Sequence, residues 1–342
     1  MGPSPGPMHF SIFRGGRGNL TMKGLCDMNA KKSRRVKSTP GERREAAWFY
    51  LMISPWLIGF FALTVYPMGA SVYYSFTNWN MFQAPKWIGL QNYAKLLHNG
   101  TFFTSLYNTF YYALIYVPLS MVIALFLAWL LNRNIRGKRF YRTLFYIPTL
   151  VPVVVSALIF MWILAPDGIM NKLLGALGIQ GPAWFYDPEW SKPGLVIMSL
   201  WGLGSGFVLL LSGMQGIPQE LYEAGYLDGT NAWQEFRHIT MPMLSPMILY
   251  NLVMNIISAL QIFTQPFVLG SQNGMPGRSG LGGGIDNSFL SMVQLLYNQA
   301  FKQYKMGYAS AIAWVLFVII LLLTLLVMKS SEAWTYYEGE SR

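Results

Sequence analysis

Long uncharged, mostly apolar stretches alternate along the sequence with shorter segments that carry nearly all of the charge. A helix needs about 20 apolar residues to cross roughly 30 Å of hydrocarbon, and six stretches are long enough. The predicted spans cover about residues 49–73, 107–131, 144–165, 194–215, 244–268 and 309–328. No Asp, Glu, Lys or Arg lies within any of these spans. The pattern therefore predicts an all-α polytopic membrane protein with six transmembrane helices.

Some features of the spans would disfavour a soluble helix. Pro118, Pro148 and Pro152 lie within or at the edges of spans, and membrane helices tolerate proline better than soluble helices do. Two further uncharged stretches, 173–186 and 287–301, are shorter than a span and are interrupted by Gly, Pro or Asn. We expect these two stretches to be interfacial or re-entrant pieces outside the membrane.

The composition argues against a soluble monomer. Hydrophobic residues make up 53% of the 342 residues and charged residues only 11%, whereas an average soluble domain carries about 25% charged residues. The chain therefore lacks the polar surface that a soluble monomer needs. Core helices of a large soluble protein are the weaker explanation of the apolar stretches.

The distribution of Lys and Arg predicts the orientation in the membrane. With the N-terminus inside, the inner segments hold 18 of the 25 basic residues, so the positive-inside rule places both termini in the cytoplasm. The net charge of +11 is then a topology signal. The basic run from Lys31 to Lys37 would also suit nucleic acid, but beside a first span it favours the membrane surface. We expect no nucleic-acid partner.

The chain divides into three predicted regions. A basic, disordered cytoplasmic tail covers 1–45, the transmembrane domain covers 46–330, and a short cytoplasmic tail covers 331–342. The first residues are rich in Gly and Pro and lack the apolar core of a signal peptide, and Met1 and Met28 are both candidate starts. Cys26 is the one cysteine, which excludes an internal disulfide.

The sequence offers no motif of nucleotide, metal or hydrolytic chemistry in a context that could use it. It contains no G-x-x-x-x-G-K-[ST], H-E-x-x-H or C-x-x-C pattern, and its one G-x-S-x-G match, Gly2–Gly6, lies in the Gly- and Pro-rich N-terminal residues and not in the strand-to-helix turn that this motif needs. Its three histidines lie in separate non-membrane segments. Proton-coupled carriers usually place ionisable groups within their spans, although sodium can be held by neutral oxygens. We therefore predict no catalytic residue, no metal site and no cofactor, and expect the energy to come from another chain.

A polar cytoplasmic loop at 216–246 separates the fourth and fifth spans. Pro218 suits the first position of a short helix, and Asp228-Gly229 is a turn dipeptide. Asn231 or Thr230 can cap a second helix, with Gln234 completing a capping box. We expect Pro242 and Pro246 to end that second helix. The loop is acidic in a basic protein, which indicates a surface for protein contact.

This loop resembles the EAA loop of binding-protein-dependent importer permeases of the maltose and glycerol-phosphate transporter type. The residues in register with that pattern are Glu223, Ala224, Asp228, Gly229, Phe236, Ile239, Pro242, Leu244 and Pro246. The chain departs from it at Gly225 and Thr230, where alanine is usual. Further landmarks extend the resemblance over about 48–330, among them Gly168–Asn171 and Met306–Ala309.

The resemblance implies a type I ABC importer permease fold in a prokaryotic cell membrane. It implies a second permease, two ATPase subunits that bind the ATP, and an extracytoplasmic solute-binding protein as partners. The loop would sit in a cleft of one ATPase and couple nucleotide-driven closure to rocking of the spans. The residues that carry this coupling would be Glu223, Ala224, Gly225, Asp228 and Gly229, with Ala224 and Gly225 presenting a thin face to the ATPase.

The fifth span contains a polar stripe made of Asn251, Asn255, Ser258, Gln261 and Gln265. On one continuous helix these residues fall within about 120° of one face. Uncharged amides and hydroxyls suit a neutral, hydroxylated solute along a translocation path, but such residues also join neighbouring membrane helices. The Gly-rich outer segment 270–287 is either a contact for the binding protein or a flexible linker.

The sequence thus predicts the permease subunit of an ABC importer for a mono- or oligosaccharide. A polyol phosphate or another polar solute is the alternative within this class. A secondary carrier or a membrane enzyme is the alternative from a different class, and uptake by the purified subunit without an ATPase would favour the carrier.

Overall fold

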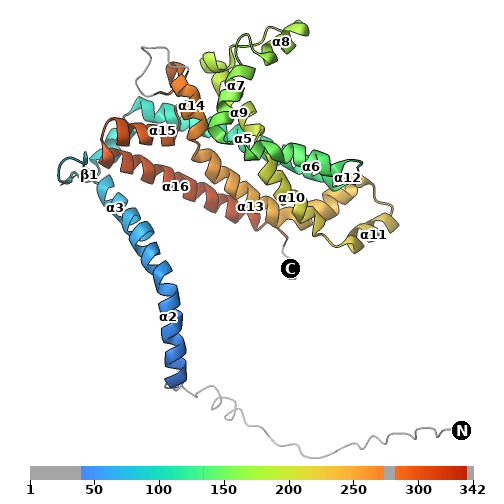
Figure 1. Cartoon of the computed structure of the whole chain (residues 1–342), viewed down its shortest axis with the longest axis horizontal. Coiled ribbons are helices and arrows are strands. Elements are labelled where there is room, and N and C mark those ends of the chain that lie inside the picture. Colours follow the sequence, from blue (N-terminus) through green and yellow to red (C-terminus); the bar gives the residue numbers. More distant parts are fainter. Residues whose placement is uncertain (1–39, 134, 273–281, 337–342) are drawn as a thin grey trace, which may run out of the picture. The chain divides into compact units, whose positions relative to one another are not determined.

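The computed structural model describes residues 40–133, 135–272 and 282–336, and the described residues are almost entirely helical (Figure 1). They fall into two units, the first ending at Tyr66 and the second beginning at Pro67. Most of the predicted N-terminal tail, including Met28 and Cys26, lies outside the described residues, as does half of the Gly-rich segment 270–287.

The first span is one continuous helical run. It consists of α2 (Pro40–Phe60), a π-helical turn η1 (Phe61–Val65) and α3 (Tyr66–Ser75). Residues 43–75 of this run are long and apolar enough to cross a membrane. The helix already begins at Pro40, within the stretch predicted as tail.

The second unit contains the remaining elements. Its first half consists of β1 (Thr77–Asn78), β2 (Lys86–Trp87), α4 (Gln91–Leu97), α5 (Gly100–Asn132), α6 (Lys138–Tyr146), η2 (Ile147–Leu150), α7 (Val153–Ile163), α8 (Ile169–Ala176), η3 (Trp184–Tyr186) and α9 (Pro188–Leu200). Its second half consists of α10 (Gly204–Gln215), α11 (Gln219–Leu227), α12 (Ala232–Glu235), η4 (Phe236–Thr240), α13 (Met241–Leu260), α14 (Thr264–Gln272), η5 (Ile285–Asn287), α15 (Met292–Tyr297), η6 (Asn298–Lys302) and α16 (Met306–Ser331). The two strands pair antiparallel, Thr77 with Trp87 and Asn78 with Lys86.

The six predicted spans all correspond to helical segments, but three of them are interrupted. The third span bends by 102° between η2 and α7, and the fourth bends by 46° between α9 and α10. Pro152 stands at the first bend and Gly202 at the second; proline disfavours a helical conformation in the residue before it, and glycine is a weak helix former. The fifth span is broken at 261–263, between α13 and α14. The predicted span over 244–268 is confirmed, because Ala232–Ser271 is long and apolar enough to cross a membrane, but its helix is interrupted at 261–263.

The core of the second unit forms where α5 packs against α10 and α13, with α16 along the other side of α13 (Figure 1). Ala124 and Ala128 of α5 are buried against Phe207 and Leu210 of α10. Small residues at such an interface let two helix backbones approach closely, which is how helices associate in a membrane where the lipid is as apolar as the side chains.

Polar contacts join the segment before α15 to α5. Asn108 Nδ2 donates to the carbonyl oxygens of Asn287 and Leu290, at 2.8 and 3.1 Å. The backbone N–H of Met292 donates to Thr109 Oγ1 at 3.0 Å. The two short uncharged stretches of the sequence form no span-length helix among the described residues. The first contains the end of α8 and η3, and the second contains α15 and most of η6.

Candidate functional site

The polar loop between α10 and α13 begins with α11, whose N-cap is Pro218. Its C-terminal end is closed by a Schellman arrangement: Thr230 N–H donates to Gly225 O and Gly229 N–H to Tyr226 O, both at 3.0 Å. Gly229 has a φ of +74°, a left-handed conformation that glycine adopts without steric cost. The predicted Asp228-Gly229 turn is therefore confirmed, and glycine stands at 229 because the turn needs a positive φ there.

The second helix of the loop starts as the sequence predicts and ends elsewhere. Asn231 Oδ1 accepts from the N–H groups of Trp233 and Gln234, and Gln234 Oε1 accepts from Asn231 N–H at 2.8 Å, which completes the capping box. The helix does not end at Pro242, because α12, the π-helical η4 and α13 form one uninterrupted run. Pro242 lies in the first turn of α13 directly after the wide π turn, where the altered hydrogen-bond pattern makes the missing N–H tolerable.

Gly225 faces the interior of the loop. It is buried, and a Cβ at this position would lie 3.0 Å from Thr230 Oγ1 and 3.1 Å from Ile239 Cδ1. The expectation that Gly225 presents a thin face to another protein is therefore wrong. The two departures from the family pattern compensate each other, because the absent methyl group at 225 leaves the space that the Thr230 side chain fills.

A double-mutant cycle tests this compensation. We expect Gly225→Ala to be more favourable in a Thr230→Ala background than in the parent chain, by about 1 kcal/mol of unfolding free energy, since residues in contact couple by about 0.5–3 kcal/mol. The measurement is the thermal unfolding of the four purified variants. Additive effects within about 0.3 kcal/mol would show that the two positions are independent.

The other predicted coupling residues lie on the loop surface. Glu223, Ala224, Asp228 and Gly229 are all exposed. Beside them, Tyr226 is 77% exposed and Leu227 is 85% exposed. We call residues 226–229 the loop tip. Sequence reasoning missed Tyr226 and Leu227. Their signal is two large apolar side chains in succession beside the acidic residues of a loop between two spans, where an exposed apolar group is typical of an interface.

One aromatic contact joins the loop to α5, a hydrogen bond within the loop supports it, and a cation covers the aromatic ring on the α5 side. The hydroxyl groups of Tyr222 and Thr240 are 3.0 Å apart and hydrogen-bonded. The Trp129 ring of α5 packs against Phe236 of η4 with 5.6 Å between centroids. The Arg133 guanidinium lies 4.5 Å from the Trp129 centroid. A force on α11 therefore reaches both α13 and α5 through packed side chains.

A cavity of about 400 Å³ lies where the interrupted spans meet. Residues from the η2–α7 bend, the α9–α10 bend and α14 contribute to its wall. Irregular backbone at membrane depth is tolerated where it is buried in protein or lines a cavity, and broken helices mark substrate sites in many transporters. The sequence signal for this cavity is the proline and glycine at the bends of two neighbouring spans, which interrupt helices that hydropathy alone predicts as continuous.

The cavity wall is polar, aromatic and uncharged among the described residues. Its polar side chains are Tyr112, Tyr116, Tyr146, Thr149, Ser156, Ser199, Ser205 and Gln265. Thr149 donates its hydroxyl proton to Tyr146 O of α6 at 2.7 Å, and Ser199 donates to Leu195 O of α9 at 2.8 Å. The oxygen of Thr149 is thereby left as an acceptor. Trp201 adds an aromatic face, and Tyr112 and Tyr116 stack with 5.0 Å between centroids. The wall thus offers acceptors, an amide and aromatic faces.

The structure separates the polar stripe that the sequence grouped on one face. Asn251 is buried and donates to Gly206 O at 3.2 Å, and Asn255 donates to the Asn251 side chain. Asn251 thus joins α13 to α10, and Asn255 also donates to Met121 Sδ of α5 at 3.5 Å. Ser258 and Gln261 are exposed, and Gln265 alone among the five lines the cavity. The prediction that all five residues share one helical face is wrong. The helix is interrupted at 261–263, so a rotation of about 100° per residue does not hold across the interruption.

Comparisons with known proteins agree with the resemblance. Residues 117–332 match the family described as "Binding-protein-dependent transport system inner membrane component". The chain is 40% identical over 314 residues to the probable ABC transporter permease protein YesP of Bacillus subtilis, covering 91% of this chain and 96% of the relative. It is 32% identical to the multiple sugar-binding transport system permease protein MsmF of Streptococcus mutans, covering 83% and 94%.

The fold also has a counterpart among solved structures. A chain of a bacterial ABC transporter involved in the import of the acidic polysaccharide alginate superposes with a TM-score of 0.72 at 21% identity. The match covers 86% of this chain and 98% of that chain. At this level of identity the likeness concerns the fold alone.

Proposed function

Because the chain belongs to the family of binding-protein-dependent transport system inner membrane components, we propose that it imports a carbohydrate as one half of a permease pair. In this proposal the second half is a homologous permease, two ATPase subunits bind the ATP, and an extracytoplasmic binding protein delivers the solute. The chain is a multi-pass membrane protein and a transport component. Both termini are proposed to lie in the cytoplasm.

The observation that carries the proposal is the anchored loop at 216–246. Its tip exposes Tyr226 and Leu227, while Tyr222 and Phe236 connect it to the cytoplasmic ends of α13 and α5. A surface of this kind suits a separate ATPase, since the chain has no phosphate-binding motif of its own. Glu223 and Asp228 would meet basic or polar groups at the edge of that contact.

The cavity supports a carbohydrate as cargo. Hydroxyl and amide groups satisfy the many donors and acceptors of a sugar, and aromatic faces stack on its C–H surfaces. A wall without charge is a poor place to fix an ion by itself. The name of the streptococcal relative, which refers to multiple sugars, points the same way.

The test is reconstitution of the assembled importer in proteoliposomes. We expect saccharide uptake to require two additions: ATP on the side of the membrane that the ATPase subunits face, and the binding protein on the opposite side. Uptake by this subunit alone, without the ATPase subunits, would overturn the proposal in favour of a secondary carrier.

Gln265 and Gln261 provide a matched pair for the cavity. We expect Gln265→Leu to raise the KM for uptake about 3- to 10-fold, because a neutral hydrogen bond contributes about 0.5–1.5 kcal/mol. Gln261→Leu, at an exposed position outside the cavity, is expected to leave KM unchanged. The measurement is initial uptake as a function of saccharide concentration. Equal effects of the two variants would exclude the cavity as the path.

A further inference from the structure

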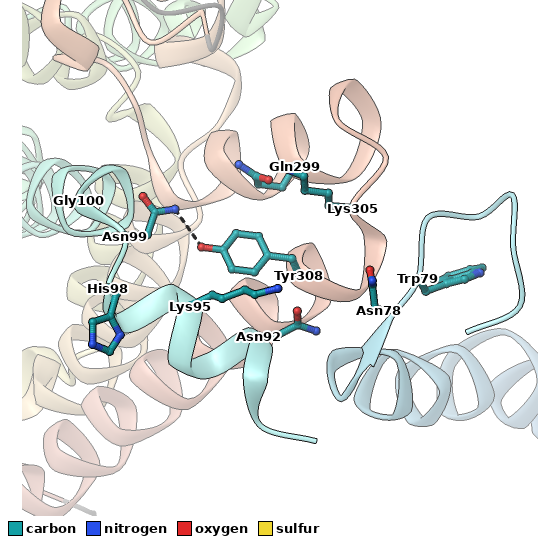
Figure 2. Close-up of a pocket in the computed structure, with 10 residues that line it drawn as sticks. All are labelled: Asn78, Trp79, Asn92, Lys95, His98, Asn99, Gly100, Gln299, Lys305 and Tyr308. Carbon is teal, nitrogen blue, oxygen red and sulfur yellow. Dashed lines mark hydrogen bonds between the residues drawn. The ribbon is translucent and has the colours of Figure 1, made fainter. Parts of the chain in front are cut away.

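A second cavity, of about 480 Å³, lies at the N-terminal ends of α5 and α16 (Figure 2). Its wall includes Lys95, His98, Asn99, Gln299, Lys305 and Tyr308. α5 has 33 residues and therefore extends about 50 Å at 1.5 Å per residue. The loop of 216–246 packs at the other end of α5, beside Trp129. In the proposed topology this second cavity, which we call the outer pocket, opens on the side from which cargo arrives.

The charge in the outer pocket is of one sign. Lys95 and Lys305 are exposed, and the Lys305 ammonium donates to Gln303 Oε1 at 2.9 Å. The two stretches of sequence that build the pocket, 46–166 and 287–331, contain no Asp or Glu. Neither lysine therefore has an acidic neighbour in its own stretch that would neutralise it, and the pocket is left with a positive potential.

Two helix N-termini add to that potential. The N-cap of α5 is Asn99, and the N-cap of α16 is Lys305. Each long helix carries a partial positive charge of about half an elementary charge at its N-terminus, where anions are favoured. The two lysines and the two helix N-termini thus all contribute positive potential to the outer pocket.

The neutral groups of the pocket are those that bind a sugar. Asn99 Nδ2 donates to the Tyr308 hydroxyl at 3.0 Å, which leaves the hydroxyl proton of Tyr308 available to a ligand. Gln299 is 7% exposed and brings an amide to the wall (Figure 2). The amide of Asn92, by contrast, is committed to the carbonyl oxygens of Ser75 and Thr77, both at 2.9 Å. Trp79 adds an aromatic ring.

From this combination we infer that the outer pocket binds the carboxylate of an acidic saccharide, with Lys95 and Lys305 facing the charge. The inference names a cargo class and so rests on the proposed function of carbohydrate import. A volume of about 480 Å³ lies within the range of about 300–1,000 Å³ typical of small-molecule sites. The ammonium groups attract the carboxylate, while Gln299 and Tyr308 hydrogen-bond the hydroxyl groups of the ring.

Calorimetry on the assembled permease pair and its ATPase subunits in nanodiscs, without binding protein, tests the inference. We expect digalacturonate to bind at least about 10-fold more tightly than its neutral counterpart, galactobiose, and to lose that preference in Lys95→Gln/Lys305→Gln. Removing two charge-assisted contacts to the carboxylate is enough to account for a change of about 10-fold in affinity. Lys86→Gln, which removes an exposed lysine of β2 outside the pocket, is the matched control and is expected to bind as the parent does.

Three results would overturn the inference. The first is equal affinity of the parent for the acidic and the neutral sugar. The second is an unchanged preference for the acidic sugar in Lys95→Gln/Lys305→Gln. The third is a double variant that no longer binds the binding protein while its affinity for digalacturonate is unchanged. The last result would assign the lysines to acidic side chains of the binding protein. ATP-dependent uptake of a neutral sugar, measured in parallel, separates the two proposals: if that uptake persists while the pocket fails to prefer the acid, only this inference falls.

Discussion

Replacing Leu227 with aspartate is expected to reduce ATP-driven uptake at least about 100-fold while the subunit remains folded and inserted. Leu227 is 85% exposed at the end of α11, so the substitution removes no packing within the chain. In the proposed assembly the same side chain is covered by an ATPase. An unpaired carboxylate in that contact would cost several kcal/mol, because it must leave water without gaining a partner.

Uptake, ATPase stimulation and co-purification of the ATPase subunits are the three measurements for this variant. Leu177→Asp is the matched control, since Leu177 is 76% exposed and follows α8, far along the chain from the loop. It is expected to transport normally. Wild-type uptake by Leu227→Asp would remove the loop tip from the coupling surface. A bulky residue at Gly225 is a poorer test, because Gly225 is buried against Thr230 and Ile239 and its replacement would disturb the loop itself.

Gly307→Val is expected to destabilise the permease by about 3 kcal/mol or more. Gly307 is the second residue of α16, and a Cβ there would overlap the carbonyl oxygen of Thr77 and lie 3.1 Å from Tyr74 O. Its N–H also donates to Trp79 O at 3.2 Å. Overpacking commonly costs about 1–3 kcal/mol, and backbone atoms can move aside less easily than a side chain.

Thermal unfolding of the purified protein measures the loss, and the yield of inserted protein gives a second readout. Gly175→Val is the control, because nothing lies within 4 Å of a Cβ built at that helical glycine. An unfolding midpoint of Gly307→Val equal to that of the parent would mean that α16 can move away from β1 without cost.

The positions and order of the apolar helices followed from hydropathy alone; four of them are long enough to cross a membrane, and the number is six if each of the two bent pairs is one span. Each apolar stretch must form its backbone hydrogen bonds internally in a membrane, so length and composition are enough to predict helices there. The capping box at Asn231 and the turn at Gly229 were equally predictable, because a local side chain or a local φ determines them. The residue types and offsets that revealed the family are also properties of the sequence itself.

What the sequence did not reveal depends on how helices meet. Pro242 ends no helix because a π turn precedes it, and Gly225 turns inward because Thr230 and Ile239 occupy its other side. The polar stripe separated into a packing pair, Asn251 with Asn255, and a cavity residue, Gln265, because the helix breaks between them. A helical wheel assumes a continuous axis and cannot place residues beyond such a break.

The sequence by itself determined that this protein crosses the membrane several times, that it belongs to the importer permeases, and where the loop that we propose for the ATPase contact lies. Local hydrogen bonding, hydropathy and residue spacing are sufficient for those conclusions. The tertiary structure decided which side chains of the loop are exposed and which residues surround the internal cavity. It also decided that Lys95 and Lys305, more than two hundred positions apart in the chain, line one pocket. Those facts depend on contacts between distant segments, which the packing of α5 against its neighbours creates and no local pattern encodes.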